Sequence, residues 1–224
     1  MELPELVRRR RVRRSFDAGA PVPRAVLREL VDLATRAPSA GASQGWDFLV
    51  LDGEDVGRYW AATADPSRPA DRWLRGMRTA PALVLAWSRE AAYRERYALP
   101  DKASGSHAPA GLDARWPVPY WHVDVGMAVA LLLLAAEHHG LGACPFAVPT
   151  ARVDAVRTAF GVPADRTPVM VVALGTPAGH PDDELGDVGD GEPGLPAGAA
   201  PRRPSRRRPL DDVAHLGCFG RPLA

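Results

Sequence analysis

Two features of this sequence have the chemistry to bind a ligand. Arginines gather near both ends of the chain, in residues 8–14 and 206–208. Their planar guanidinium groups suit phosphate, because each can donate two parallel hydrogen bonds. Between these clusters, the stretch 39–45 holds only small or polar residues, so its backbone can lie close to a bound molecule. The hydroxyls of Ser39 and Ser43 and the amide of Gln44 suit a flat heterocycle with several hydrogen-bonding atoms.

Each feature also has a simpler explanation. Residues 39–45 have the composition of an ordinary loop between a helix and a strand, since glycine, serine and proline mark most loops. Either arginine run, taken alone, is typical of charge exposed to solvent. If the two ends of the chain meet, however, the arginines form one cationic pocket of the size of a phosphate.

Metal-binding and dinucleotide-binding patterns are absent from the sequence. Cys144 and Cys218 are too few for a disulfide framework or a four-cysteine zinc site. His138 and His139 are adjacent on a predicted helix, so they point in different directions and cannot chelate a metal together. A Gly-x-Gly at 140–142 follows a helix rather than a strand, which is the wrong order for a dinucleotide-binding fingerprint. We therefore expect no metal site.

Length and charge limit the function further. The chain has 224 residues, and we predict a single domain over 1–224 with an extended or flexible segment at 179–205. The formal charge of +1 gives no overall field to attract nucleic acid or membrane. Residues 1–14 lack the apolar core of a signal peptide, and the longest apolar run, 125–136, is too short to span a bilayer. We expect a cytoplasmic protein that binds neither nucleic acid nor membrane.

Hydrophobic periodicity predicts several helices and a few apolar strands. The strongest predicted helix, 120–139, is apolar on most of its circumference, so we expect it in a core or at a subunit interface. The strands are few and do not alternate strictly with the helices, which favours an α+β layered sheet over a doubly wound parallel one. Residues 100–119 have the composition of a lid. Helices are expected at 4–14, 23–36, 54–64, 71–78, 88–97, 120–139 and 150–160, the last capped by Thr150, and strands at 48–51, 82–87 and 168–175.

Several motifs follow one another in a characteristic order. The chain opens with Arg10-Arg11-Val12-Arg13-Arg14-Ser15-Phe16, then Pro21-Val22-Pro23, then Ala37–Trp46. The later motifs are Tyr120–Gly126, Leu141–Phe146, Val171–Gly175 and Arg207–Leu210. In this order and spacing they closely resemble the nitroreductase family, whose members are FMN-dependent NAD(P)H oxidoreductases. The resemblance covers nearly the whole chain and says almost nothing about the substrate.

The resemblance implies a fold, a cofactor and a quaternary structure. The family has an α+β fold with a mixed central sheet wrapped by helices. Its members are homodimers built on a long buried central helix, with two FMN sites at the interface. NAD(P)H would be the electron donor, and a small conjugated electrophile such as a nitroaromatic or a quinone would be the acceptor. The flavin, rather than any catalytic side chain, would carry the chemistry.

The resemblance also implies a set of cofactor-binding residues. Arginines from both termini would hold the phosphate, and residues from 38–44 of the partner subunit would contact the ribityl chain and ring. Two residues after the central helix would lie against the isoalloxazine. The set is Arg10, Arg11, Arg14, Pro38, Ser39, Ala40, Gln44, Pro145, Phe146, Arg207 and Arg208.

The sequence departs from the family pattern at three positions. Val12, Ala42 and Gly45 stand where the family usually has serine, asparagine and proline. An average hydrogen bond is worth only ~1 kcal/mol, so losing one or two donors need not abolish flavin binding. The alternative function is a protein of the same fold that sequesters FMN without turnover.

Overall fold

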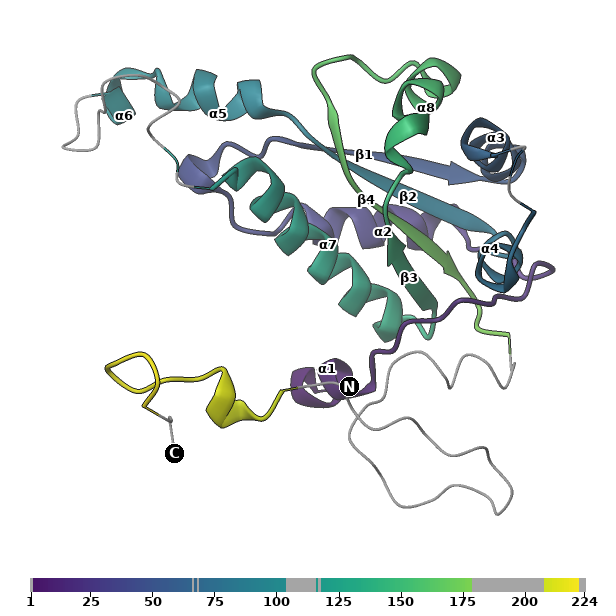
Figure 1. Cartoon of the computed structure of the whole chain (residues 1–224), viewed down its shortest axis with the longest axis horizontal. Coiled ribbons are helices and arrows are strands. Elements are labelled where there is room, and N and C mark those ends of the chain that lie inside the picture. The colour runs from purple at the N-terminus through teal and green to yellow at the C-terminus, as the bar shows by residue number, and fades with distance from the viewer. Residues whose placement is uncertain are drawn as a thin grey trace. The chain divides into compact units, whose positions relative to one another are not determined.

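The computed structural model describes residues 2–65, 67, 69–103, 116, 118–178 and 208–221. The chain divides into two units, Met1–Gly179 and His180–Ala224. The larger unit is built on a four-stranded sheet with the strand order β1-β2-β4-β3 (Figure 1). Its strands are β1 (Trp46–Asp52), β2 (Ala82–Ser88), β3 (Gly142–Phe146) and β4 (Thr167–Gly175).

The sheet lies between two layers of helices. Its central strand β2 is buried at all seven positions, which fits its continuous apolar sequence. One face packs against α2 (Arg24–Ala34) and α7 (Tyr120–His138), and the other against α3 (Glu54–Thr63), α4 (Arg72–Met77) and α8 (Val153–Phe160). The remaining helices are α1 (Leu3–Arg9), α5 (Glu90–Tyr97), α6 (Pro100–Ala103) and the short 3₁₀ turns η1 (Ala40–Ala42), η3 (Thr150–Arg152) and η5 (Leu210–Asp212).

This arrangement confirms the predicted α+β class. The pairings between neighbouring strands of the sheet are all antiparallel. A parallel component comes from Val12, which forms an isolated bridge with Ala143 at the free edge of β3. The N-terminal segment therefore continues the sheet beyond its last strand.

Three local predictions differ from the structure. Strand β3 was not predicted, because its five residues include Gly142 and Pro145, which are poor strand formers and tolerated at a sheet edge. The first helix ends at Arg9 rather than Arg14, since the following residues are drawn out along β3. Thr150 caps no helix; it starts η3, and α8 begins at Val153 without a side-chain cap.

Helix α7 is buried along one side only. Its buried residues face α2 and the sheet, whereas Val123 is 44% exposed and Met127 and Leu131 are half-buried. By length and composition alone, α7 is the one helix among the described residues that could cross a bilayer. Its contacts with α2 and all four strands are those of a core helix, and its outer side is apolar and partly exposed within one chain.

The segment that carries the N-terminal arginines is fixed at several points. The Phe16 amide donates to Thr79 Oγ1 at 2.8 Å, and the Asp17 amide donates to the Thr176 carbonyl at 2.9 Å. Gly76 in α4 lies so close that a Cβ there would stand 2.2 Å from the Arg14 carbonyl oxygen. The backbone of the arginine segment is therefore set by the fold before any ligand binds.

This close approach gives a stability prediction. Gly76→Ala should lower the free energy of unfolding by about 1–3 kcal/mol, because the new methyl forces the Arg14 backbone away. Gly57→Ala is the matched control, since Gly57 lies in α3 with open space around its Cα. Gly57→Ala should raise the free energy of unfolding by up to about 1 kcal/mol, because alanine has a higher helix propensity than glycine. Urea denaturation measures both, and equal midpoints for the two variants would contradict the contact.

Candidate functional site

The loop that precedes β1 has an unusual backbone. Its turn η1 contains Gly41 with a φ of 64°, and the non-glycine residues Ala42 and Gln44 have φ values of 55° and 48°. Such left-handed conformations are uncommon for residues with a Cβ and persist where the surroundings enforce them. Within the loop, the Gln44 amide donates to Ser39 Oγ at 3.0 Å, and Ser43 Oγ donates to the Ala40 carbonyl at 2.6 Å.

Three side chains from other elements hold this loop against the body of the protein. The Ala40 amide donates to Asp124 Oδ2 at 2.8 Å, and the Tyr93 hydroxyl donates to the same oxygen at 2.7 Å. Arg96 Nε donates to the Gly41 carbonyl at 2.8 Å. Burial, and then the bond to Asp124, raises the pKa of the Tyr93 hydroxyl, which therefore stays a donor at neutral pH.

Two glycines let the loop approach α5 closely. A Cβ at Gly41 would stand 2.8 Å from the ring of Tyr97, and one at Gly45 would stand 2.5 Å from the ring of Tyr93. The Gly45 carbonyl also accepts a hydrogen bond from the Arg89 amide at 2.8 Å. Gly45, which departs from the family pattern, thus has a packing reason in this chain.

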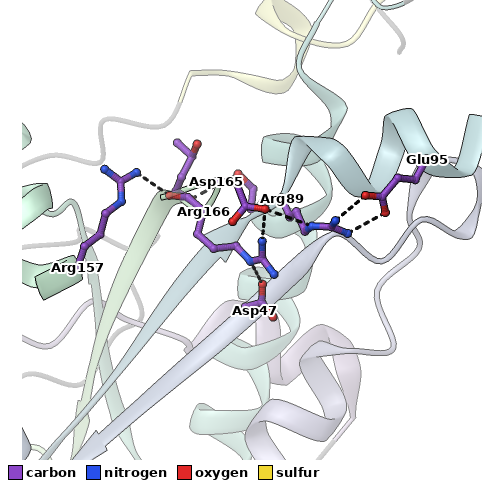
Figure 2. Close-up of polar contacts among 8 residues, drawn as sticks. Asp47, Arg89, Glu95, Arg157, Asp165 and Arg166 are labelled. Atoms are coloured by element: carbon purple, nitrogen blue, oxygen red, sulfur yellow. Dashed lines mark hydrogen bonds and ion pairs between the residues drawn. The ribbon is translucent and has the colours of Figure 1, made fainter. Parts of the chain in front are cut away.

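An ion-pair network joins the strand ends beside the loop (Figure 2). Arg166 contacts Asp47 at the start of β1 and Asp165, the latter at 2.7 Å. Arg89, just after β2, lies 3.5 Å from the same Asp165 carboxylate and 2.5 Å from Glu95 in α5. Exposed pairs contribute little singly, but these share carboxylates and hold three strand ends and α5 together.

A buried serine lies below this network. Ser88, the last residue of β2, is 1% exposed, and its Oγ lies 2.9 Å from Nδ1 of His122 in the first turn of α7. Burial lowers the pKa of His122, with the charge of Glu90 acting in the opposite direction. The imidazole is therefore neutral at pH 7.

The predicted phosphate-binding arginines of the N-terminus lie beside β3. The Arg13 amide donates to the Ala143 carbonyl at 3.0 Å, which fixes the extended segment against the strand. Arg10, Arg11 and Arg14 are half-buried along it, and Arg11 Nη1 donates to the Arg10 carbonyl at 3.0 Å. Their donor chemistry suits a phosphate.

The predicted ring-contacting residues belong to the same strand. The ring of Phe146 stacks on Trp60 at 5.8 Å and meets Trp73 edge-on at 5.6 Å. It packs against the core on the α3 and α8 side of the sheet, so Pro145, one residue earlier in the strand, faces the opposite side. The structure thus brings both residues near the arginine segment but directs their side chains apart.

The C-terminal arginines belong to the second unit of the chain. Arg207 lies outside the described residues, and Arg208 belongs to the smaller unit, where its Nη2 donates to the Asp212 carbonyl at 2.6 Å. The predicted role of both in holding a phosphate stays a prediction.

Helix α7 separates the two halves of the predicted site. Asp124, which holds the loop, lies in its second turn, whereas Glu137, which lies 3.7 Å from Arg9, is in its last turn. At 1.5 Å per residue these positions are about 20 Å apart along the helix. The loop also precedes β1, and the arginine segment lies on β3, at opposite edges of the sheet.

Asp124, Tyr93 and Arg96 are missing from the residues predicted from the sequence. Asp124 is detectable in principle, because its carboxylate directly precedes the apolar run 125–136 of the same helix. Tyr93 and Arg96 give no such signal, since their roles depend on how α5 packs against the loop. No group of three metal-ligating side chains occurs among the described residues.

Comparison with known proteins decides the family. The model of the Nitroreductase family matches residues 7–176. The chain belongs to the nitroreductase family. A 4-nitrobenzoate reductase of Nocardioides sp. (strain LMS-CY) is 30% identical to this family member over 207 residues, covering 79% of this chain and 81% of the relative.

Solved structures agree on the fold. A Staphylococcus epidermidis protein named as an NAD(P)H:FMN oxidoreductase superimposes on this nitroreductase-family chain with a TM-score of 0.64 at 18% identity, covering 96% of this chain and 95% of the other. A gut-bacterial enone reductase gives a TM-score of 0.60 at 21% identity, with 80% and 90% covered. The predicted family and nitroreductase fold are confirmed.

The left-handed residues of the loop give a second prediction. Ala42→Gly should raise the free energy of unfolding by about 1 kcal/mol, because a left-handed conformation costs an L-residue about that much and glycine far less. The matched control is Ala61→Gly on the exposed surface of α3, which should lower it by about 1 kcal/mol. Thermal or urea unfolding compares them, and destabilisation by both changes would refute the strain.

The half-buried His122 gives a prediction for the pH dependence of stability. Because its pKa is lower in the folded chain than the ordinary value of about 6.5, the unfolded chain binds its proton more readily in mildly acidic solution. Stability should therefore fall as pH drops below about 6.5, down to the folded pKa. His122→Asn, which keeps a polar partner for Ser88, should show a shallower fall. Urea midpoints of wild type and His122→Asn, measured across this pH range, provide the test. Equal slopes of midpoint against pH in the two proteins would contradict the role of His122.

Proposed function

We propose that this protein is an FMN-dependent NAD(P)H oxidoreductase that acts as a homodimer on a small conjugated electrophile. The observation that carries the proposal is the placement of donor groups on the two sides of the molecule. Extended arginines lie on the edge of β3, and a loop with two half-buried serines and the exposed Gln44 lies at the start of β1. The family supports a flavin, and the relative named as an NAD(P)H:FMN oxidoreductase supports FMN.

The predicted cofactor-binding residues have the chemistry to hold FMN. Arg10, Arg11 and Arg14 offer charged, fork-shaped donors on a segment whose backbone is already fixed, which suits a phosphate monoester. Gln44 is exposed on the loop, so its carboxamide is accessible to a bound ring. When bound, FMN supplies hydride and electron transfer.

The distance along α7 supports a site shared between two protomers. An FMN whose phosphate lies on the arginine segment is about 20 Å along α7 from the loop of the same chain. The loop of a second protomer can reach it if α7 packs against its own copy. The apolar outer side of α7 supplies a surface for that contact, since Val123 is 44% exposed and Met127 and Leu131 are only partly buried.

The residues of this chain would bind the flavin and orient it toward the acceptor. Arginine side chains would neutralise the phosphate, and Ser39, Ala40 and Gln44 of one protomer would contact the ribityl chain and ring held by the other. The shared aromatic cluster of Tyr97, Trp116 and Trp121, with ring centroids 5.3 and 6.0 Å apart, lies beside the loop and would exclude water from a flat acceptor.

The names of the relatives support the class of acceptor. One reduces 4-nitrobenzoate, and another is an enone reductase. Both substrates are conjugated electrophiles that accept electrons at a planar centre. A nitroarene is our first candidate acceptor, and the near-neutral chain is proposed to work in the cytoplasm.

The test is spectroscopic. Protein purified with added FMN should be yellow and elute as a dimer, and anaerobic NADPH or NADH should bleach the flavin absorbance. Adding 4-nitrobenzoate should restore it. Bound flavin that stays oxidised with both donors would instead identify a sequestering protein, and colourless protein that takes up no FMN would refute the cofactor.

A pair of arginine substitutions tests the phosphate contact. Arg14→Ala should raise the dissociation constant for FMN about tenfold or more, because it removes a charge-assisted donor from the phosphate. Arg28→Ala is the matched control, since Arg28 is exposed on α2 and belongs to neither half of the predicted site. Equal affinities for FMN in the two variants would contradict the assignment of Arg14.

A further inference from the structure

A buried carboxylate in an apolar helix needs a physical reason. Asp124 is 2% exposed and is the one buried charged side chain among the residues that the structure describes. Moving a carboxylate out of water is unfavourable unless strong hydrogen bonds compensate for the lost hydration. An apolar residue at this position would pack α7 against the sheet at lower cost, so stability of the core does not explain the charge.

The hydrogen bonds of Asp124 join three elements. Its Oδ2 accepts from the Ala40 amide at 2.8 Å and from the Tyr93 hydroxyl at 2.7 Å. The Ala40 amide is the first of turn η1, and Ser39 provides no side-chain cap to that turn. The Asp124 carboxylate therefore caps turn η1, because it accepts a hydrogen bond from the first amide of the turn, as a capping residue does in a helix. Tyr93 completes the link, because its ring lies against Gly45 at the other end of the loop.

The loop needs such an external hold. Left-handed residues at Ala42 and Gln44 disfavour the observed conformation in a free chain, and the hydrogen bonds of Ser39 and Ser43 are internal to the loop. Arg96 supplies a second external contact, to the Gly41 carbonyl, but its side chain is partly exposed and also paired with Asp101. Both bonds involve a charged group, but Asp124 is 2% exposed whereas the side chain of Arg96 is 25% exposed, so water competes less with Asp124.

We propose that Asp124 is a positioning residue for the flavin site, which holds the 39–44 loop in the conformation that contacts the cofactor of the partner subunit. The effect on flavin binding rests on the proposed function, whereas the effect on the loop rests only on the observed hydrogen bonds. Asp124 itself would not touch the cofactor. It acts through the Ala40 amide, so its loss should change loop order and flavin affinity together.

Three variants separate positioning from general stability. Asp124→Ala removes the acceptor, and Asp124→Asn keeps a neutral acceptor of the same shape that should recover part of the effect. Leu132→Ala is the matched control, because Leu132 is fully buried two turns further along α7 and faces the core rather than the loop. It weakens the same helix without removing any contact to Ala40.

Two measurements decide the proposal. In FMN-free protein, hydrogen exchange of the peptide covering 40–44 should speed up about tenfold or more in Asp124→Ala, and less in Asp124→Asn, as expected for losing one hydrogen bond of ordinary strength. Quenching of flavin fluorescence should show a rise in the FMN dissociation constant in the same order. Leu132→Ala should change neither, although it lowers the melting temperature.

The outcomes are distinguishable. Unchanged exchange at 40–44 in Asp124→Asn would overturn the proposal, as would equal loss of FMN affinity in Leu132→Ala and the Asp124 variants. If Asp124→Ala fails to fold, hydrogen exchange at 40–44 and FMN affinity in Asp124→Asn, compared with wild type, still test the proposal. If the wild-type protein binds no FMN, the proposed function fails, whereas the exchange measurement still tests whether Asp124 holds the loop.

Discussion

The packing of α7 across one face of the sheet is the constraint on which the rest of the molecule depends. Its buried side closes the core against α2 and the central strands, so its position is set by apolar contact along its length. Near one end it anchors the loop before β1, and near the other it meets the N-terminal helix. A single rigid element thus fixes two groups of polar residues about 20 Å apart.

The N-terminal arginines depend on a second, more local constraint. Their segment is extended because it pairs with the edge of β3 and is pressed between α4 and the end of β4. Arginine-rich sequence alone favours a solvated helix, and the sequence indeed predicts helix up to Arg14. Backbone hydrogen bonds to a neighbouring strand overrule that local preference, and the result is a preformed row of cationic side chains.

The sequence was sufficient for the family, the α+β class and most helices, because these follow from periodic apolar residues and ordered motifs. It was insufficient for β3, whose glycine and proline hide a strand that only its partner β4 stabilises. It also missed the residues that hold the loop. Tyr93 and Arg96 act through packing between elements far apart in sequence, which no local pattern reveals. The glycine at position 45 also has its reason in packing, because the ring of Tyr93 leaves no room there for a side chain.

The two sides of the loop before β1 are held by different kinds of force. On one side, a buried carboxylate makes short contacts away from ions in solution; on the other, Arg166, Asp47 and Asp165 meet at the protein surface. Dissolved salt screens surface pairs strongly and buried ones weakly. A rise in ionic strength would therefore loosen the strand ends first and leave the serine-bearing turn seated on its helix. In this way the fold keeps the geometry of the turn insensitive to the ionic composition of its surroundings.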